Sequence, residues 1–240
     1  MPNTEPFVSP EGKRQYVLDM FSGMAGHYDR MNRVLSLGRD LSWRRTLAER
    51  ANLSPDSRVL DVAAGTGDVT LILAERAPSG KVVGVDFARP MLALASKKAC
   101  RAKAENVTLV QGDALRLPFA DDTFDAATTA FSLRNITDVA GLFTEMRRVL
   151  RPCGRLACME MCKPTLPVFR NLFGLYFNRV VPILGRTLAR NREAYTYLPD
   201  SLNRFMTSGQ VMRHLHEAGF RWVGCQKLML GTVAIYVGLK

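Results

Sequence analysis

The stretch that decides the fold is Val59-Leu60-Asp61-Val62-Ala63-Ala64-Gly65-Thr66-Gly67-Asp68, which Val82-Val83-Gly84-Val85-Asp86 follows. Each run reads as a short apolar strand that ends near an acid, and the first breaks into small residues and glycines before a helix begins. Glycines let the backbone turn tightly and approach a ligand where a Cβ would collide. An acid at the tip of the second strand can accept hydrogen bonds from both ribose hydroxyls. The layout predicts a nucleoside-binding crevice at the carboxyl edge of a parallel sheet.

The loop differs from the dinucleotide fingerprint, because Thr70 stands where a third glycine would be needed. Thr66 and Asp68 add oxygen acceptors, whereas a pyrophosphate is bound by N–H donors. The loop therefore favours a cationic or neutral nucleoside. Its spacing from Asp61 through Gly65 to Gly67 resembles motif I of class I methyltransferases, which implies S-adenosylmethionine as the ligand.

The composition bounds the class of protein. At 240 residues and 47% hydrophobic content, the chain is long enough for one large α/β domain. The first residues carry neither a basic start nor an apolar core, and no run has the length of a membrane-spanning helix. The five cysteines show no metal-ligand spacing, so we expect reduced thiols and no metal site. These features predict a cytoplasmic protein.

The net charge of +11 favours an anionic partner, either a phospholipid surface or a nucleic acid. Arginines gather between Arg30 and Arg58 and again between Arg170 and Arg192. A nucleic-acid-binding protein is one alternative, but it has charge as its only support, because no recognised binding motif accompanies it. A solvated basic surface is the plainer alternative. We expect no nucleic-acid partner and a peripheral contact with the anionic inner face of a membrane.

The order of elements predicts a doubly wound, mostly parallel seven-stranded sheet of Rossmann-like type. Residues 1–12 read as a flexible tail, and 13–240 as a single domain. Within that domain 13–53 form a helical lid with a turn at 36–40, and 164–204 form a helical insertion before the last strands. Strands are expected at 58–61, 81–86, 107–111, 124–131, 155–160, 221–230 and 233–238. A turn at 151–154 is expected to precede the fifth strand, and the last two strands are expected to form an antiparallel edge. Helices are expected at 69–76, 90–103, 139–150 and 211–218.

A second acid follows the third predicted strand, in Gln111-Gly112-Asp113-Ala114. It falls at the same edge of the sheet as Gly65 and Asp86. Asp113 could accept from an adenine amine, and Ala114 could offer its backbone N–H to the ring. A helix cap or Asx-turn explains Asp113 equally well.

Four further segments are more specific than the glycine loop. They are Tyr28-Asp29-Arg30-Met31-Asn32, Phe131-Ser132-Leu133-Arg134-Asn135, Met159-Glu160-Met161-Cys162-Lys163-Pro164 and Tyr195-Thr196-Tyr197-Leu198-Pro199-Asp200-Ser201. With the Trp43-Arg44-Arg45 run, they resemble the ubiquinone/menaquinone biosynthesis C-methyltransferase family over nearly the whole chain. The resemblance implies a class I methyltransferase fold, S-adenosylmethionine as cofactor, and methylation of a ring carbon of a polyprenylated benzoquinol or naphthoquinol.

The same resemblance implies cofactor contacts at Thr66, Asp86 and the pair Asp113-Ala114. The chain departs from the family pattern at Ala130, where a serine is frequent, at Cys153, and at Met161-Cys162. Ala130 removes one expected hydrogen bond to the cofactor. These departures leave open a second reading, in which the acceptor is another phenolic or polyketide-like small molecule.

Carbon methylation needs a phenol whose proton leaves as the ring attacks, so the catalytic candidates are residues that stabilise or move charge. Arg134 is the first candidate, because a guanidinium can clamp a phenolate. Asn135 could orient the second ring oxygen. Tyr28 and Asp29 could close over the reactants from the lid, with Asp29 relaying a proton. The alternatives are that Arg134 pairs with an acid such as Asp29 and that Tyr28 only packs.

The insertion carries an unusually broad apolar surface between Val168 and Val181. As a helix, this stretch leaves only a narrow polar stripe of Arg170, Gly174 and Asn178. The apolar remainder could line a channel for a prenyl chain, with nearby arginines at anionic headgroups. A homodimer interface or ordinary packing of a lid explains the same surface.

Overall fold

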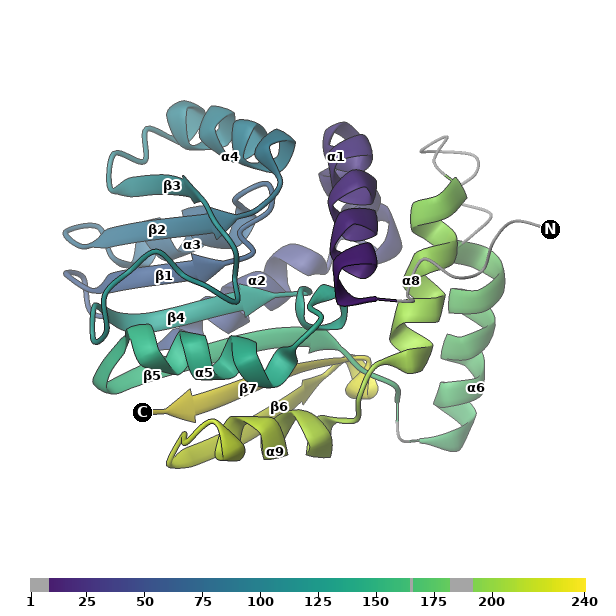
Figure 1. The fold of residues 1–240 in the computed structure, drawn as a ribbon. Coiled ribbons are helices and arrows are strands. Elements are labelled where there is room, and N and C mark those ends of the chain that lie inside the picture. Colours follow the sequence, from purple (N-terminus) through teal and green to yellow (C-terminus); the bar gives the residue numbers. More distant parts are fainter. Residues whose placement is uncertain (1–8, 165, 182–191) are drawn as a thin grey trace.

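The computed structural model describes residues 9–164, 166–181 and 192–240, and these form a seven-stranded sheet with helices on both faces (Figure 1). The strand order is β3-β2-β1-β4-β5-β7-β6. The strands are β1 (Arg58–Val62), β2 (Lys81–Asp86), β3 (Val107–Gln111), β4 (Phe124–Ala130), β5 (Leu150–Met161), β6 (Trp222–Leu228) and β7 (Val233–Leu239). Strands β1 to β5 pair in parallel, and β7 pairs antiparallel with both β5 and β6. The predicted fold class and its antiparallel edge are confirmed.

The centre of the sheet is apolar on both faces. Val59 and Leu60 are adjacent in β1 and point to opposite faces, yet both are fully buried. Strand β1 pairs with β2 on one side and β4 on the other, so the strand order reverses there. Ligands of open parallel sheets bind at such a reversal, outside the carboxyl ends of the strands.

Helices from both halves of the chain cover the two faces. On one face, α5 (Val139–Val149) and α9 (Ser208–Glu217) bury residues such as Phe143 and Leu215. On the other, α2 (Asp40–Ala51) and α3 (Asp68–Arg76) bury Leu47 and Leu73, and α4 (Arg89–Ala102) packs beside them. Helix α9 begins earlier than predicted, because Thr207 forms a capping box with Gln210.

The lid is dominated by one long helix, α1 (Pro10–Leu35), which lies beyond the carboxyl edge of the sheet (Figure 1). The helix starts inside the predicted tail, because the Ser9 side chain accepts from the N–H of Gly12 and Pro10 suits the first turn. Residues 10–12 therefore belong to α1, and 1–8 lie outside the described residues. The predicted turn at 36–40 separates α1 from α2, with Gly38 at φ +77°.

The insertion folds as α6 (Pro167–Leu175), a π-helical turn (Tyr176–Val180) and α8 (Arg192–Arg204). Figure 1 shows α6 and α8 next to each other at the end of the sheet, beyond α1. Phe177 and Tyr197 of the insertion share an apolar cluster with Val17 and Met20 of α1. The insertion and the lid therefore form one helical layer. The side chains of Arg170 and Asn178, from the predicted polar stripe, lie outside the described ones.

Strand β5 differs from its prediction. The turn expected at 151–154 is instead an irregular part of the strand, which already pairs Leu150 with Phe124. The register then shifts between Phe124 and Ala126, and Cys153 adopts φ +65°. Pro152 and Gly154 lie in a β-bulge. Proline and glycine are also typical of turns, so the sequence of the bulge resembles that of a turn.

Candidate functional site

The glycine loop between β1 and α3 is shaped by two glycines with positive φ. Gly67, at φ +84°, packs against α4 so closely that a Cβ would lie 2.9 Å from the Cβ of Ala95. Gly65, at φ +58°, has nothing within 4 Å of the place of a Cβ. Gly67 therefore fixes the path of the loop, and Gly65 leaves its side open toward the adjoining cavity.

That cavity, of about 480 Å³, lies at the carboxyl ends of β1, β2 and β3, and we name it the polar cavity. It brings together four of the predicted cofactor residues, namely Gly65, Asp86, Asp113 and Ala114. Helix α1 forms the wall opposite the sheet, with Glu11, Arg14 and Tyr28 among its lining residues. The cavity therefore lies between the sheet and the lid.

Asp86 is the buried acid of the polar cavity. Its two carboxylate oxygens accept from the backbone N–H groups of Gly65 (2.7 Å) and Ala88 (2.9 Å). Burial raises the pKa of this carboxyl, and the backbone donors partly oppose that rise. A carboxylate oxygen can accept more than one hydrogen bond, so Asp86 keeps acceptor capacity for hydroxyl groups in the cavity.

Asp113 forms the Asx-turn that was one of the two interpretations of its sequence. One carboxylate oxygen accepts from the N–H of Leu115 at 2.9 Å, which is an Asx-turn. The other lies 3.1 Å from the guanidinium of Arg14 on α1, and the residue lines the polar cavity. Asp113 therefore shapes its own loop and also connects that loop to the lid.

Three other predicted cofactor residues, Asp61, Thr66 and Gly67, are not among the residues that line the cavity. Asp61 is buried and accepts from the hydroxyls of Thr70 (2.7 Å) and Thr128 (2.9 Å), which joins β1 to α3 and β4. Burial raises the pKa of Asp61 to about 6. In this arrangement Asp61 supports the glycine loop from behind.

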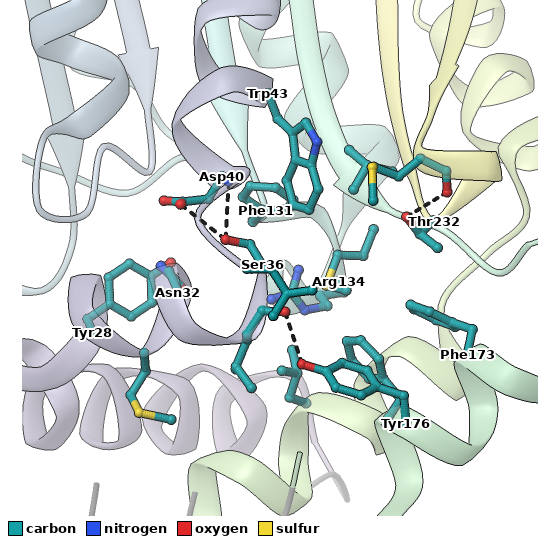
Figure 2. A pocket seen from close by; sticks show the side chains of 18 of the residues that line it. Tyr28, Asn32, Ser36, Asp40, Trp43, Phe131, Arg134, Phe173, Tyr176 and Thr232 are labelled. Carbon is teal, nitrogen blue, oxygen red and sulfur yellow. Dashed lines mark hydrogen bonds between the residues drawn. The ribbon is translucent and has the colours of Figure 1, made fainter. Parts of the chain in front are cut away.

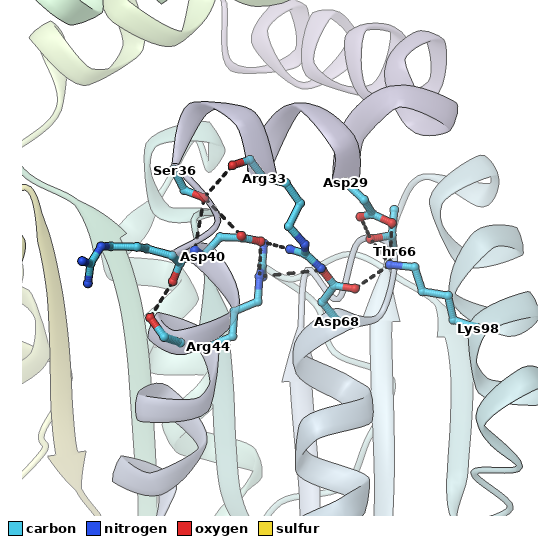
Figure 3. A network of polar contacts seen from close by, with 10 residues as sticks. Asp29, Arg33, Ser36, Asp40, Arg44, Thr66, Asp68 and Lys98 are labelled. Atoms are coloured by element: carbon cyan, nitrogen blue, oxygen red, sulfur yellow. Dashed lines mark hydrogen bonds and ion pairs between the residues drawn. The ribbon is translucent and has the colours of Figure 1, made fainter.

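Thr66 faces a polar network that connects the lid to the loop (Figure 3). Its hydroxyl donates to Asp29 of α1 at 2.5 Å and accepts from Lys98 of α4 at 3.0 Å. Lys98 also pairs with Asp29 (2.6 Å) and Asp68 (2.5 Å). Burial opposes the charged form of Asp68, but its cationic neighbours outweigh that effect and lower its pKa. Asp29 thus holds the lid on the loop and is not among the residues lining either cavity.

A second cavity, of about 340 Å³, lies between the lid and the insertion, and we name it the apolar cavity (Figure 2). The lid and the insertion supply most of its apolar wall, including Met20, Met24, Phe169, Leu172, Phe173 and Tyr176. Four residues border both cavities: Phe21, Tyr28, Phe131 and Asn135. The two cavities therefore adjoin at the end of β4, next to the catalytic candidate Arg134.

Arg134 lies at this junction, in the 3-10 turn Leu133–Asn135. Arg134 lines the apolar cavity, and its guanidinium pairs with Glu160 of β5, which is fully buried. The prediction that Arg134 pairs with an acid is confirmed, but its partner is Glu160 and not Asp29. The Arg134 Nε is buried with no hydrogen-bond partner among the described residues. Glu160 was quoted in the sequence analysis as part of the Met159–Pro164 segment but was not predicted as a partner of Arg134.

Asn135 is held from two sides. The Tyr197 hydroxyl, on α8, donates to its side-chain oxygen at 3.0 Å, and its side-chain nitrogen donates to the carbonyl of Phe131 at 3.3 Å. Burial raises the pKa of Tyr197 to about 12, so this hydroxyl remains protonated at neutral pH. Tyr197 was not predicted as a site residue, although it lies in the quoted Tyr195–Ser201 segment.

Comparison with known proteins places this geometry in a family. The model of the ubiE/COQ5 methyltransferase family matches residues 10–240. A demethylmenaquinone methyltransferase from Roseiflexus castenholzii is 42% identical over 238 residues, covering 99% of each chain. Another from Thermus thermophilus is 45% identical over 91% of this chain and 99% of its own.

Solved structures agree on the fold. A SAM-dependent methyltransferase from Aquifex aeolicus has a TM-score of 0.62 at 19% identity, over 88% of this chain and 97% of its own. The [4+2]-cyclase SpnF has a TM-score of 0.68 at 22% identity, over 91% of this chain and 77% of its own. Identities this low show the fold alone, and one fold can support different reactions. None of the described helices is both long enough and apolar enough to span a membrane.

Proposed function

This chain belongs to the ubiE/COQ5 methyltransferase family, and from that premise we propose that it methylates a ring carbon of a polyprenylated quinol, of the demethylmenaquinol type. It is an S-adenosylmethionine-dependent C-methyltransferase. The observation that carries the proposal is the junction of two unlike cavities at Tyr28, Phe131 and Asn135. A polar cavity suits a nucleoside donor, and an apolar cavity suits a prenylated ring.

The polar cavity fits S-adenosylmethionine by the chemistry of its donors and acceptors. When bound, this cofactor supplies an electrophilic methyl group on a sulfonium. In the proposed arrangement the buried Asp86 carboxylate accepts from the ribose hydroxyls, and the backbone N–H of Ala114 meets the adenine ring beside Asp113. Gly65 leaves room for the rest of the cofactor, since no side chain projects from its open side.

The apolar cavity takes the quinol. The relatives are named demethylmenaquinone methyltransferases, which favours a naphthoquinol ring. A benzoquinol ring of ubiquinone biosynthesis is smaller and would enter the same space. Phe169, Leu172 and Phe173 of α6 would contact the prenyl chain, since all three line the cavity.

The chemical work falls to the residues at the junction. The ring carbon becomes nucleophilic as the neighbouring hydroxyl loses its proton, and the Arg134 guanidinium stabilises the resulting phenolate. Asn135, oriented by Tyr197, holds the ring in line with the donor, and Tyr28 closes the junction from the lid. Such positioning can contribute about 7–11 kcal/mol to a barrier. Asp29 contributes through the lid network, because its contacts are Thr66 and Lys98.

We also propose that the protein is cytoplasmic and touches the inner face of the membrane through α6. Val168, Leu172 and Leu175 recur at helical spacing and are 76%, 59% and 59% exposed. Phe169 and Phe173, on the same helix, line the apolar cavity. A lipid surface at this face would let a prenylated substrate pass from the membrane into the cavity beneath α6. A homodimer is the alternative occupant of the face.

Methyl transfer from labelled donor tests the proposal. The purified full chain is incubated anaerobically with methyl-labelled S-adenosylmethionine and a short-tailed demethylmenaquinol. We expect label in the naphthoquinol and none with the oxidised quinone, which has no hydroxyl to lose a proton. Transfer to simple phenols but not to the quinol would instead support the alternative acceptor class.

A further inference from the structure

Arg44 of α2 is buried in the wall of the apolar cavity, with only 6% of its surface exposed. Its guanidinium carbon lies 5.5 Å from the centroid of the Phe131 ring, at the junction with the polar cavity. Among the described residues it has no hydrogen-bond partner. Two buried side-chain nitrogens there are without a partner, and they are the Nε atoms of Arg44 and Arg134. Both arginines line the same cavity.

Neither of the two nearby carboxylates forms a hydrogen bond with Arg44. Its Nε lies 3.9 Å from Asp40 and 3.9 Å from Asp68, which is beyond hydrogen-bond distance. Asp40 already pairs with Arg33 and contacts the Ser36 hydroxyl, and Asp68 pairs with Lys98 at 2.5 Å (Figure 3). Each carboxylate thus has a closer cation than Arg44.

Arg44 makes no hydrogen bond to any described residue although it is 6% exposed, which is costly for a guanidinium that has lost most of its contact with water. The cost is removed when a ligand brings an oxygen acceptor to it. The Phe131 ring offers Arg44 a cation–π contact but no acceptor oxygen. Arg44 therefore has the properties of a binding residue whose partner is a ligand of the apolar cavity.

We propose that Arg44 binds the second ring oxygen of the quinol, the one remote from the methylated carbon, while Arg134 serves the oxygen beside that carbon. This assignment rests on the proposed function. A quinol presents oxygens on opposite sides of one ring, and one arginine from each of two separate elements, α2 and the turn after β4, lines the cavity. Each of these arginines has a buried Nε without a hydrogen-bond partner among the described residues. Arg44 thereby makes the cavity selective for rings with two oxygens.

The selectivity follows from the state of Arg44 when a ring with only one oxygen is bound. A ring with a single hydroxyl can bind Arg134 and would leave the buried Arg44 guanidinium without a hydrogen bond. A site built around a buried donor rejects analogues that lack the matching acceptor. The basic Trp43-Arg44-Arg45 run, which the cofactor site did not use, thus has a role at the acceptor site.

Binding measurements with two matched probes test the proposal. The diol probe is a short-tailed demethylmenaquinol, and the mono-ol probe is the same prenylated ring without the remote hydroxyl. Affinities are measured by anaerobic calorimetry with S-adenosylhomocysteine present. Arg44→Met should weaken diol binding about 10- to 100-fold, the range expected for a lost hydrogen bond to a charged group, and change mono-ol binding less than about threefold. In turnover, KM for the diol should rise far more than kcat falls.

Two further variants complete the design. Arg45→Met, on the exposed side of the same helix, should bind both probes as the wild type does. Arg44→Lys keeps the charge without the planar fork, should recover part of the diol affinity, and replaces Arg44→Met if that variant does not fold. Equal weakening of both probes, or unchanged diol binding, overturns the assignment. A wild-type protein that binds S-adenosylhomocysteine but neither probe contradicts the proposed function itself.

Discussion

Arg134 is held in place by an acid that solvent does not reach. Glu160 is fully buried and accepts from the Arg134 guanidinium, from the Arg134 backbone N–H at 3.2 Å, and from the Met161 N–H at 2.8 Å. A buried ion pair with good hydrogen bonds fixes the direction of the guanidinium. The position of Arg134 at the junction is therefore preorganised, which is what a residue that stabilises developing charge requires.

Arg134→Ala tests that role directly. Removing one charge-stabilising donor of this kind lowers kcat about 10²- to 10³-fold. We expect such a loss with the quinol, while the affinity for S-adenosylhomocysteine, measured by calorimetry, stays near the wild-type value because Arg134 does not line the polar cavity. Unchanged turnover would show that the oxyanion role is wrong.

Tyr197→Phe tests whether the orientation of Asn135 matters. The change removes a 3.0 Å hydrogen bond and little volume, so kcat/KM should fall about 2- to 12-fold, as for a single neutral hydrogen bond. Tyr176→Phe is the matched control, since Tyr176 lines the same cavity but donates to the carbonyl of Leu35. An equal loss in both variants would mean that Asn135 is not the reason.

Elements, rather than single residues, define the loop that borders the polar cavity. Asp61 ties β1 to α3 and β4 through two threonine hydroxyls, and its burial has a consequence for stability. Because its pKa is raised, the native protein binds this proton more tightly than the unfolded chain. The contribution of Asp61 to the free energy of unfolding therefore decreases as the pH rises from about 4 to about 6.

Asp61→Asn removes that titration. We expect the free energy of unfolding of the variant, relative to the wild type, to increase between pH 4 and pH 6 by up to about 3 kcal/mol, and to stay level above that range. Urea unfolding at several pH values measures it. Two curves that remain parallel across the range would show that the Asp61 carboxyl titrates normally in the native protein.

The boundaries of the strands could be predicted well from the sequence, whereas the irregular pairing of β5 could not. Strands β2 and β3 begin and end where expected, because buried parallel strands are continuous apolar runs bounded by turn residues. The bulge in β5 was taken for a turn, since Pro152 and Gly154 occur in both structures. Local patterns identify an element but do not reveal what a long-range pairing does to it.

The same limit applies to the site. Gly65, Asp86, Asp113 and Ala114 could be placed together, because the carboxyl ends of parallel strands share one edge. The Arg134–Glu160 pair could not, because Arg134 lies in the turn after β4 and Glu160 lies in β5, and nothing in the sequence gives their distance. The contact between Thr66 and Asp29 of the lid could not be predicted either, because the lid lies far away in the sequence.

The whole molecule combines a Rossmann-like half with a helical layer at one end of the sheet (Figure 1). The polar cavity is bordered mainly by the carboxyl edge of the sheet and by α1, and the apolar cavity is bordered mainly by the lid and the insertion. This division explains why the loop after β1 indicates only the methyl donor. The acceptor depends on helices whose packing the sheet does not determine.

The exposed face of α6 gives a prediction at this scale. The double change Leu172→Glu and Leu175→Glu should abolish flotation with vesicles that contain anionic lipid, since two exposed apolar side chains would be replaced by carboxylates that anionic headgroups repel. The matched control is Leu37→Glu, because Leu37 is equally apolar, 83% exposed, and lies in the turn after α1. Vesicle binding that persists in the double variant contradicts the membrane contact, and a change from dimer to monomer identifies a homodimer face instead.

The central claim is that the junction of the two cavities transfers a methyl group to carbon. The most direct measurement is carbon-13 NMR of the product formed from demethylmenaquinol and S-adenosylmethionine labelled at its methyl carbon. The account predicts one labelled methyl signal at the shift of a methyl on the quinone ring. A labelled methoxy signal, or label found only in unreacted donor, would contradict it.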